Sequence, residues 1–265
     1  MITSRHNSFI KSLRAVRDGR EESLIFIEGV RLCEEAAALP DIHIIDVLYA
    51  ARLQETERGI NLLEKLSLHS SARLTLATDD VLASIADTRT NQGIALVAAR
   101  PQTGGDRLAT SIASLPLIVV LDGVTNPTNA GAILRATEAS GATGAISTVG
   151  TCDLFSPKAL RGAMGSSLRL PVWTNAAAAD ISRWCAARDI GIFALDASAT
   201  ETYTEVDWRR PAALVVGAEG RGFAGREIQG GMLRIPMRPA VESLNVAVAI
   251  GIVLYEAARQ RGFSF

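Results

Sequence analysis

Three polar segments, each placed directly after an apolar strand-like run, carry the residues that could do chemistry in this 265-residue chain. Segment 122–141 combines amides with an arginine, and segment 214–225 surrounds one glutamate with glycines. Segment 234–259 joins a strand, two prolines and an apolar helix with a polar start. Amides and guanidinium groups orient oxygen atoms, and glycine lets a ligand approach the backbone closely. The pattern predicts a ligand site built from three loops.

The first segment predicts a turn followed by a helix over 129–140. Asn126-Pro127 forces the turn, and Asn129 is expected to cap the helix. Arg135 follows Asn129 by fewer than two helical turns, so its long side chain can reach back toward the loop. The alternative is an ordinary capped helix with an arginine on its surface.

The second segment is a glycine-rich loop after an expected strand at 213–217. Its order, G-x-x-G-x-G, differs from the G-x-G-x-x-G of dinucleotide-binding folds, and the chain contains no G-K-[ST] phosphate loop. Glu219 stands in the middle, where it would repel phosphates. The loop therefore predicts close approach by a ligand other than a phosphate chain, or else a tight turn with no ligand.

The third segment predicts a final helix that opens at Ser243, a good N-cap, with Asn245 in its first turn. The run from Val246 to Tyr255 is nearly all apolar, and a helix that is apolar on every side must be covered on every side. Asn245 can serve a ligand or can be a structural capping amide.

Short apolar strands separated by helices in the second half predict a parallel sheet covered on both faces, and thus an α/β fold. In such sheets ligands bind at the carboxyl ends of the strands, where all three segments lie. Pro, Gly-Gly and small polar residues at 101–116 predict a linker. It separates a smaller mixed α/β domain over 1–100 from a larger domain over 117–265. In chain order, strands are expected at 24–29, 42–49, 73–77, 94–98, 118–122, 145–149, 170–172, 192–196, 213–217 and 233–235, and the intervening helices include 4–17, 53–66, 156–164, 178–189 and 224–229.

Composition narrows the class of protein. A hydrophobic content of 48% and a charged content of 21% are those of a globular protein, and a net charge of −1 gives no global attraction to nucleic acid. The three cysteines are scattered along the chain, which argues against a disulfide framework. The three histidines all lie before residue 70, and no group of metal-ligating residues is apparent, so no metal site is predicted. No signal peptide or membrane span is apparent, so a cytoplasmic protein is expected.

The conjunction of the three segments is more specific than its parts. N-P-T-N-x-G-x-x-x-R, then G-A-E-G-x-G, then I-P-M-x-x-x-x-E-S-L-N-V-A-V-A occur in this order. The sequence resembles the SpoU (TrmH-type) RNA 2′-O-ribose methyltransferases of the SPOUT superfamily over 117–260. The segments S-R-H-N-S-F-I-K-S-L and F-I-E-G-V-R-L-C-E-E-A also resemble the ribosomal-protein-like substrate-binding domain often fused to them.

The resemblance implies a deep trefoil knot, a homodimer formed by the catalytic domain, and S-adenosylmethionine as the cofactor, with no metal. The matching catalytic positions are Asn129, Arg135, Glu219 and Asn245. The implied cofactor-binding positions are Gly217, Ala218, Ile235, Met237, Ser243 and Leu244. A free guanidinium is not deprotonated in proteins, so Arg135 is expected to orient the target ribose and stabilise alkoxide character.

RNA is the implied partner. The basic segment 1–20 places Arg5, Asn7, Lys11 and Arg14 at near-helical spacing, and such a stripe can follow an RNA backbone. A solvated helix face is the alternative. The fused domain of about a hundred residues favours large-subunit ribosomal RNA over transfer RNA. A non-catalytic RNA-binding protein on the same fold is a second hypothesis, and a dinucleotide-dependent oxidoreductase is a third, weakened by the missing fingerprint.

Overall fold

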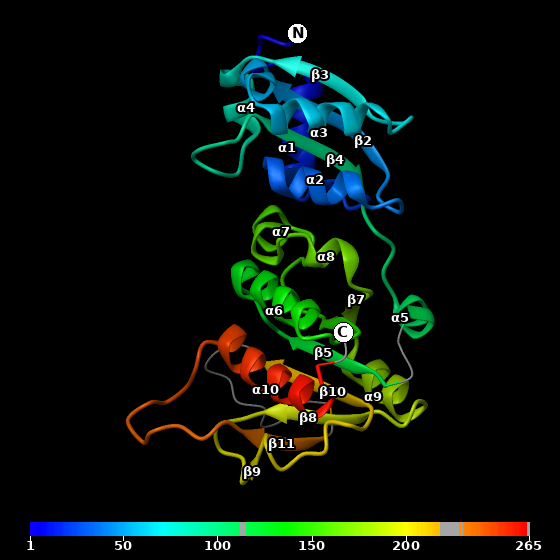
Figure 1. The fold of residues 1–265 in the computed structure, drawn as a ribbon, viewed down its shortest axis with the longest axis vertical. Coiled ribbons are helices and arrows are strands. Elements are labelled where there is room, and N and C mark those ends of the chain that lie inside the picture. The colour runs from blue at the N-terminus through cyan, green and yellow to red at the C-terminus, as the bar shows by residue number, and fades with distance from the viewer. Residues whose placement is uncertain (112–114, 218–227, 229, 264–265) are drawn as a thin grey trace. The chain divides into compact units, whose positions relative to one another are not determined.

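The computed structural model describes residues 1–111, 115–217, 228 and 230–263. Its contacts divide the chain into two compact units (Figure 1). The first unit is Met1–Pro101 with Phe155–Arg169, and the second is Gln102–Leu154 with Leu170–Phe265. The helical segment Phe155–Arg169, assigned to the catalytic domain by its position in the sequence, therefore packs with the first unit.

The first unit is built on a mixed four-stranded sheet in the order β1-β4-β2-β3. Strand β4 runs antiparallel to both β1 and β2, and β2 pairs in parallel with β3. The strands are β1 (Leu24–Glu28), β2 (Ile44–Ala50), β3 (Arg73–Ala77) and β4 (Ile94–Ala99). The helices are α1 (Ser8–Arg17), α2 (Val30–Ala38), the 3₁₀ helix η1 (Ala51–Glu55), α3 (Glu57–Ser67), α4 (Asp79–Ile85), α7 (Pro157–Ala163) and α8 (Ser166–Arg169).

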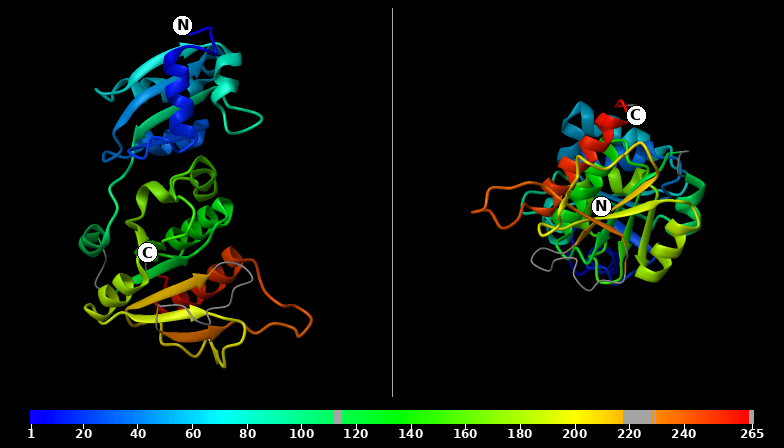
Figure 2. Two further views of the ribbon diagram at one scale, coloured as in Figure 1. Left: turned by 180° about the vertical axis from the view of Figure 1, so that it is seen from behind. Right: turned by 90° about the horizontal axis from the view of Figure 1, so that it is seen from below.

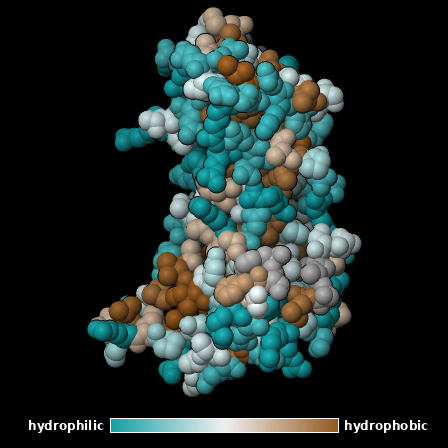
Figure 3. All heavy atoms as spheres, in the orientation of Figure 1, coloured by the Kyte–Doolittle hydropathy of each residue, from teal (hydrophilic) through white to brown (hydrophobic). Residues whose placement is uncertain are grey.

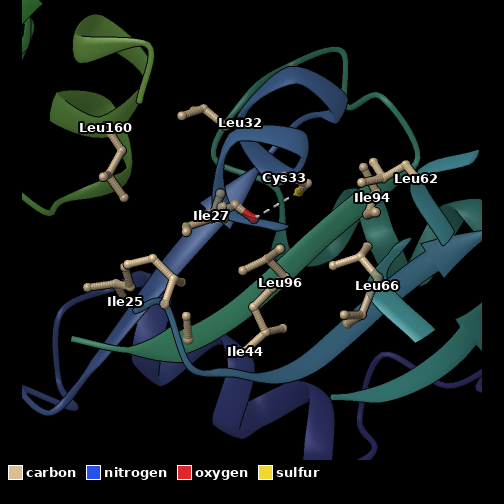
Figure 4. Packing of buried hydrophobic residues seen from close by; sticks show 14 of the residues in the cluster. Ile25, Ile27, Leu32, Cys33, Ile44, Leu62, Leu66, Ile94, Leu96 and Leu160 are labelled. Carbon is tan, nitrogen blue, oxygen red and sulfur yellow. Dashed lines mark hydrogen bonds between the residues drawn. The ribbon is translucent and has the colours of Figure 1, made fainter. Parts of the chain in front are cut away.

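Helices cover both faces of this sheet because alternate strand residues point to opposite faces. On β1, Ile25 and Ile27 pack with α2 and α3, whereas Phe26 packs with α1 and α4. Figure 4 shows the first of these clusters, to which Leu160 of α7 also belongs. Cys33 lies in the same cluster, with its thiol 3.9 Å from the carbonyl oxygen of Ile27.

The second unit is built on a seven-stranded sheet in the order β7-β6-β5-β10-β8-β11-β9. Every pairing within it is parallel, which confirms the predicted sheet type. The strands are β5 (Leu117–Asp122), β6 (Gly144–Thr148), β7 (Val172–Ala176), β8 (Gly191–Leu195), β9 (Glu201–Thr202), β10 (Ala212–Gly217) and β11 (Gly231–Arg234). The helices are α5 (Gly105–Ser111), α6 (Pro127–Ala139), α9 (Ala178–Ala186) and α10 (Val246–Gln260).

Two layers of helices enclose this sheet. The side chains of Ile118 and Val120 on β5 point into a cluster formed with α5 and α9. The alternate residues Val119 and Leu121 are fully buried on the other face, where α6 contacts β6 and α10 contacts β10. Helices α6 and α10 also pack against each other and lie side by side in both views (Figures 1 and 2).

Some elements depart from the expected ones, including the short α8 and β9, which were not predicted. Helix α4, with Asp79 and Asp80 in its first turn, was not predicted, because its seven residues are too few to show a helical period. Helix α5 lies inside the predicted linker. The helix expected at 224–229 falls outside the described residues except for Ile228. Within the described part of the chain, no helix is both long and apolar enough to cross a membrane.

Candidate active site

Helix α6 begins behind Asn126, whose side-chain oxygen accepts hydrogen bonds from the main-chain N–H groups of Thr128 (2.9 Å) and Asn129 (3.4 Å). The prediction that Asn129 caps this helix is therefore wrong. Pro127 explains the difference, because its fixed φ and missing N–H favour the first position of a helix. The cap is then the residue just before Pro127, which is Asn126. Asn129 lies in the first turn and is half-buried.

Helix α10 likewise begins behind an asparagine. Asn245 Oδ1 accepts hydrogen bonds from the main-chain N–H groups of Ala247 (3.0 Å) and Val248 (3.3 Å). Ser243, which was predicted to be the cap, is exposed and lies two residues before it. Asn245 is the better cap here because its side-chain carbonyl oxygen reaches two main-chain amides.

The two helix starts are joined directly. Asn245 Nδ2 donates a hydrogen bond to Asn129 Oδ1 at 3.2 Å, across 116 positions of sequence. The first and third motifs therefore meet at one point, as their order after parallel strands predicted. With its Oδ1 committed to the cap of α10, Asn245 fixes the orientation of the Asn129 amide as well as its own.

A second network holds the loop that leads from β5 into α6. The N–H of Gly123 donates to Thr148 Oγ1 and to Thr151 Oγ1, each at 3.0 Å. Thr148 Oγ1 in turn donates to Asp122 Oδ1 at 2.9 Å, and Thr151 Oγ1 donates to the carbonyl oxygen of Leu121 at 2.9 Å. Sequence reasoning missed both threonines. The sequence feature that could have identified them is a pair of threonines three residues apart at the carboxyl end of β6, the strand next to β5.

Arg135 lies on α6, about 9 Å along the helix axis from Asn129, as follows from six residues at 1.5 Å each. Its side chain is exposed, and among the described residues it makes no hydrogen bond or ion pair. The structure therefore does not show Arg135 reaching back to the loop. It shows a guanidinium with all five donors available to a ligand.

The predicted cofactor loops follow β10 and β11. Gly217 ends β10, paired in register with Asp122 of β5. Ile235, Met237 and Leu244 are half-buried in the stretch after β11. Within the described residues, their main-chain N–H and C=O groups make no backbone hydrogen bonds.

Free main-chain groups flanked by apolar side chains suit the polar edges and flat faces of an adenine ring, and the residues present therefore fit a nucleoside cofactor. Ala218 and Glu219, predicted to take part in cofactor binding and catalysis, lie outside the described residues. In the described part of the chain, no group of His, Cys, Asp and Glu side chains could hold a metal ion.

Three of the four residues predicted to bind RNA on α1 and just before it have other partners. Asn7 caps α1 by accepting from the N–H of Phe9. Arg14 donates to the carbonyl oxygen (3.1 Å) and hydroxyl (2.7 Å) of Ser84 on α4. Arg5 forms an ion pair with Asp80 at 3.4 Å, and Lys11 is exposed. Only part of the predicted stripe is thus open to a ligand.

A parallel sheet enclosed by helices, with the amides of Asn129 and Asn245 joined beyond its carboxyl edge, is the arrangement in which α/β proteins bind a ligand at that edge. The chain belongs to the SpoU rRNA methylase family, which matches residues 116–255. Residues 7–96 match the MRM3-like substrate binding domain. The methyltransferase class and the fused substrate-binding domain predicted from the motifs are confirmed.

Relatives named for this chemistry align along most of the chain. A Synechocystis protein named as a tRNA/rRNA methyltransferase is 32% identical over 98% of this chain and 94% of its own length. A Ralstonia nicotianae protein named as a 23S rRNA (guanosine-2′-O-)-methyltransferase is 33% identical over 83% of this chain and 90% of its own.

Solved structures agree with the fold. An AdoMet-bound rRNA methyltransferase of Sinorhizobium meliloti superposes with a TM-score of 0.83 at 27% identity, over 97% of each chain. The SpoU methyltransferase AviRb of Streptomyces viridochromogenes, in complex with AdoMet, superposes with a TM-score of 0.86 over 97% of this chain and 98% of its own. Its identity of 24% supports the fold alone. The α/β fold of the SpoU class is confirmed, and the knot stays a prediction.

Proposed function

We propose that this protein transfers the methyl group of S-adenosylmethionine to the 2′-oxygen of a ribose in large-subunit ribosomal RNA. The observation that carries the proposal is the hydrogen bond from Asn245 to Asn129, which joins two of the three motifs at the carboxyl edge of the sheet. The identity of the RNA is supported by the relative named for 23S rRNA, which aligns with both units of this chain.

S-adenosylmethionine, when bound, supplies an electrophilic methyl group on a sulfonium, so a new O–C bond forms as the C–S bond breaks. Gly217, Ile235, Met237 and Leu244 would hold its adenosine through main-chain groups and apolar walls. Ser243, exposed beside Leu244, is the remaining described candidate for contact with the cofactor.

The residues of α6 and α10 act on the ribose. Asn129, whose side-chain oxygen accepts a hydrogen bond from Asn245, orients the ribose hydroxyls. Arg135 binds the adjacent phosphate and stabilises negative charge as the 2′-hydroxyl loses its proton to water or to an RNA phosphate. All three histidines precede residue 70, so the second unit has no imidazole to act as a base.

A homodimer formed by the catalytic domain is part of this proposal. One face of α10 is buried, but Val248 and Tyr255 remain 52% and 48% exposed, with Ile252 half-buried between them. These positions lie on one side of the helix, and Figure 3 shows hydrophobic residues gathered over the start of α10. A second copy packed on this stripe would supply the cover that so apolar a helix requires.

The dimer is checked by sedimentation equilibrium. We expect the full chain to sediment as a dimer and a V248D/Y255D variant as a monomer of the same fold. A wild-type chain that sediments as a monomer at micromolar concentration would refute this part of the proposal.

The reaction is tested by incubating the full chain with tritiated S-adenosylmethionine and large-subunit ribosomal RNA, followed by mapping of alkali-resistant 2′-O-methyl positions. One discrete methylated ribose in that RNA is the expected result. Methylation of transfer RNA alone would show that the proposed reaction is right and the proposed RNA substrate is wrong. Transfer to no RNA, with intact RNA binding, would favour a non-catalytic RNA-binding protein.

A further inference from the structure

A buried carboxylate in the first unit fixes a surface loop. Among the described residues, Glu28 at the end of β1 is the only charged side chain that is buried, with 4% of its surface exposed. Its Oε2 accepts a hydrogen bond from the N–H of Asp87 at 2.7 Å, and its Oε1 accepts from the Thr88 hydroxyl. Both donors belong to the loop 86–93 between α4 and β4. Burying a charge is costly unless it is hydrogen-bonded, so this loop has one strongly preferred conformation.

The far end of the loop is fixed as well. Gln92 Oε1 accepts a hydrogen bond from the N–H of Val30, the first residue of α2, at 2.8 Å. The Arg52 guanidinium donates to the Asn91 carbonyl oxygen at 2.9 Å and to its side chain. Surface loops are usually the mobile parts of a fold. This one is held from both ends by β1, α2 and η1, as expected of a loop that presents its tip to a partner.

The exposed charge around this loop is positive. Arg89 at its tip and Arg31 in the first turn of α2 are both exposed, and neither forms an ion pair or a hydrogen bond among the described residues. Four neighbouring acids are each paired with a cation, whereas the buried Glu28 accepts hydrogen bonds only from uncharged donors. The pairs are Glu34 with Arg58 at 2.5 Å, Asp79 with Arg52 at 2.6 Å, Glu35 with Arg169, and Asp87 with Arg161. Arg31 and Arg89 therefore flank the hydrogen bond between Gln92 and Val30 without forming an ion pair, although Glu34, one helical turn from Arg31, has a pKa lowered mainly by Arg58 and in small part by Arg31.

Helix α1 offers less free charge than this loop. Arg14 and Arg17 donate hydrogen bonds to carbonyl oxygens of residues 84–86, and Arg5 forms an ion pair with Asp80. Only Lys11 is exposed and unpaired among the four cations of this helix and its approach. A phosphate would therefore meet existing partners at Arg5, Arg14 and Arg17, but not at Arg31 or Arg89.

We propose that the loop 86–93 and the first turn of α2 form the RNA-contacting surface of the first unit. Arg31 and Arg89 bind backbone phosphates there, and Glu28 is the positioning residue that fixes the loop. Hydrophilic side chains protrude at this loop in Figure 3. Phosphate contacts of this kind set the affinity and register of the RNA without reading its sequence. The inference rests on the proposed function in one respect, namely that the partner is RNA.

The surface is tested by RNA binding of the full chain at several salt concentrations, with protein-free large-subunit ribosomal RNA as the probe. The R31A/R89A variant removes two free charges, and R5A/K11A is the matched control that removes two charges from α1. We expect R31A/R89A to bind on the order of tenfold or more weakly and to lower the slope of log affinity against log salt by about 1.4 to 1.8. The control should change both quantities less, and both variants should bind S-adenosylmethionine as the wild type does.

The role of Glu28 has its own readout. Both carboxylate oxygens of Glu28 accept hydrogen bonds, and in an E28Q variant an NH₂ group replaces one of them, so one of these hydrogen bonds is lost. Hydrogen exchange of the main-chain amides in 86–93 should then be faster, and the affinity for RNA should fall. Adding E28Q to R31A/R89A should cause no further loss of affinity, because the loop then has no free charge to position. A further loss equal to that of E28Q alone would show a merely structural role. If E28Q does not fold, the arginine pair still decides the proposal.

The outcomes separate the two proposals. Wild-type affinity and salt slope in R31A/R89A, with methyl transfer intact in the wild type, would overturn the surface and leave the function standing. A wild type that binds this RNA through Arg31 and Arg89 but methylates no RNA would overturn the function and leave the surface standing. A wild type that binds no RNA at low salt would overturn both.

Discussion

Helices α1 and α6 both begin behind an asparagine cap and both carry arginines, yet they use the guanidinium group in opposite ways. On α1, Arg14 and Arg17 donate to the backbone of residues 84–86 and tie the helix to α4. On α6, Arg135 is exposed and has no hydrogen bond or ion pair among the described residues. The arginines of α1 stabilise the fold, whereas the arginine of α6 is available to a ligand.

The difference shows that counting arginines on a helix does not identify a binding surface. A guanidinium whose donors already meet carbonyl oxygens has fewer N–H groups left for a phosphate, and using the occupied ones would leave those carbonyls without a partner. A free guanidinium gains a bidentate contact with phosphate at little cost in structure. Availability of donors is therefore the criterion that separates Arg31, Arg89 and Arg135 from Arg14 and Arg17.

The largest expected effect is the loss of catalysis in an R135A variant. If Arg135 stabilises charge on the 2′-oxygen, its removal should lower the rate of methyl transfer by about 10²- to 10³-fold, the range found when one such donor is removed from an enzyme. Single-turnover transfer of a tritiated methyl group measures this rate. The melting temperature and the Kd for S-adenosylmethionine should not change, because the side chain has no partner in the described structure. Near-wild-type transfer would remove Arg135 from the mechanism.

Next in size is a comparison of two helix caps. N7A and N245A each remove a capping side chain and should each lower the free energy of unfolding by about 1 kcal/mol. Only N245A also breaks the hydrogen bond to Asn129, so only N245A should slow methyl transfer, by about tenfold for one lost hydrogen bond. Chemical denaturation and single-turnover rates measured on both variants check this. Equal activity in the two would show that the pairing of Asn245 with Asn129 is structural.

A smaller effect is expected for R14A, the counterpart of R135A. Losing the hydrogen bonds to Ser84 should lower the free energy of unfolding by about 1 kcal/mol, because the partly buried carbonyl keeps some access to water. The rate of methyl transfer by the folded protein should stay unchanged. Urea denaturation of R14A beside R135A tests the pair together. The contrast between the helices fails if R135A is the less stable of the two.

The sequence was sufficient to predict the fold of the second unit, because buried parallel strands leave a local signal. Leu117–Asp122 and Ala212–Gly217 are short apolar runs followed by glycine or polar residues, and they pair in register as neighbours. The nearness of the loops that carry Asn129 and Asn245 also followed from position, since each loop comes after a strand of one parallel sheet. Periodicity and strand order carry this kind of information.

The caps and the charges could not be predicted in the same way. Ser243 and Asn245 are both good capping residues, and the choice between them depends on which backbone amides tertiary packing brings within reach. Whether an arginine is free depends on contacts made far along the chain, such as those between Arg14 and Ser84, 70 positions apart. Glu28 carried no local signal at all, because a carboxylate at the end of an apolar strand does not reveal the loop it will bind.

The smallest expected effect concerns a thiol beside the loop that leads into α6. The N–H of Cys152 donates to the carbonyl oxygen of Val124 at 3.0 Å, and burial, aided by the charge of Asp153, raises the pKa of Cys152 to about 11 from its ordinary value of 9.0. The unfolded chain therefore loses this proton at lower pH than the folded one, so its contribution to stability is complete below pH 9 and declines toward pH 11. Iodoacetamide should accordingly alkylate Cys152 slowly at pH 8, with a rate that keeps rising up to about pH 11. Peptide mapping of the alkylated protein measures the rate at each thiol. A rate that levels off near pH 9 would mean that the loop before α6 is open to water. The exposure of Arg135 would then be a property of the whole region and not of that side chain alone.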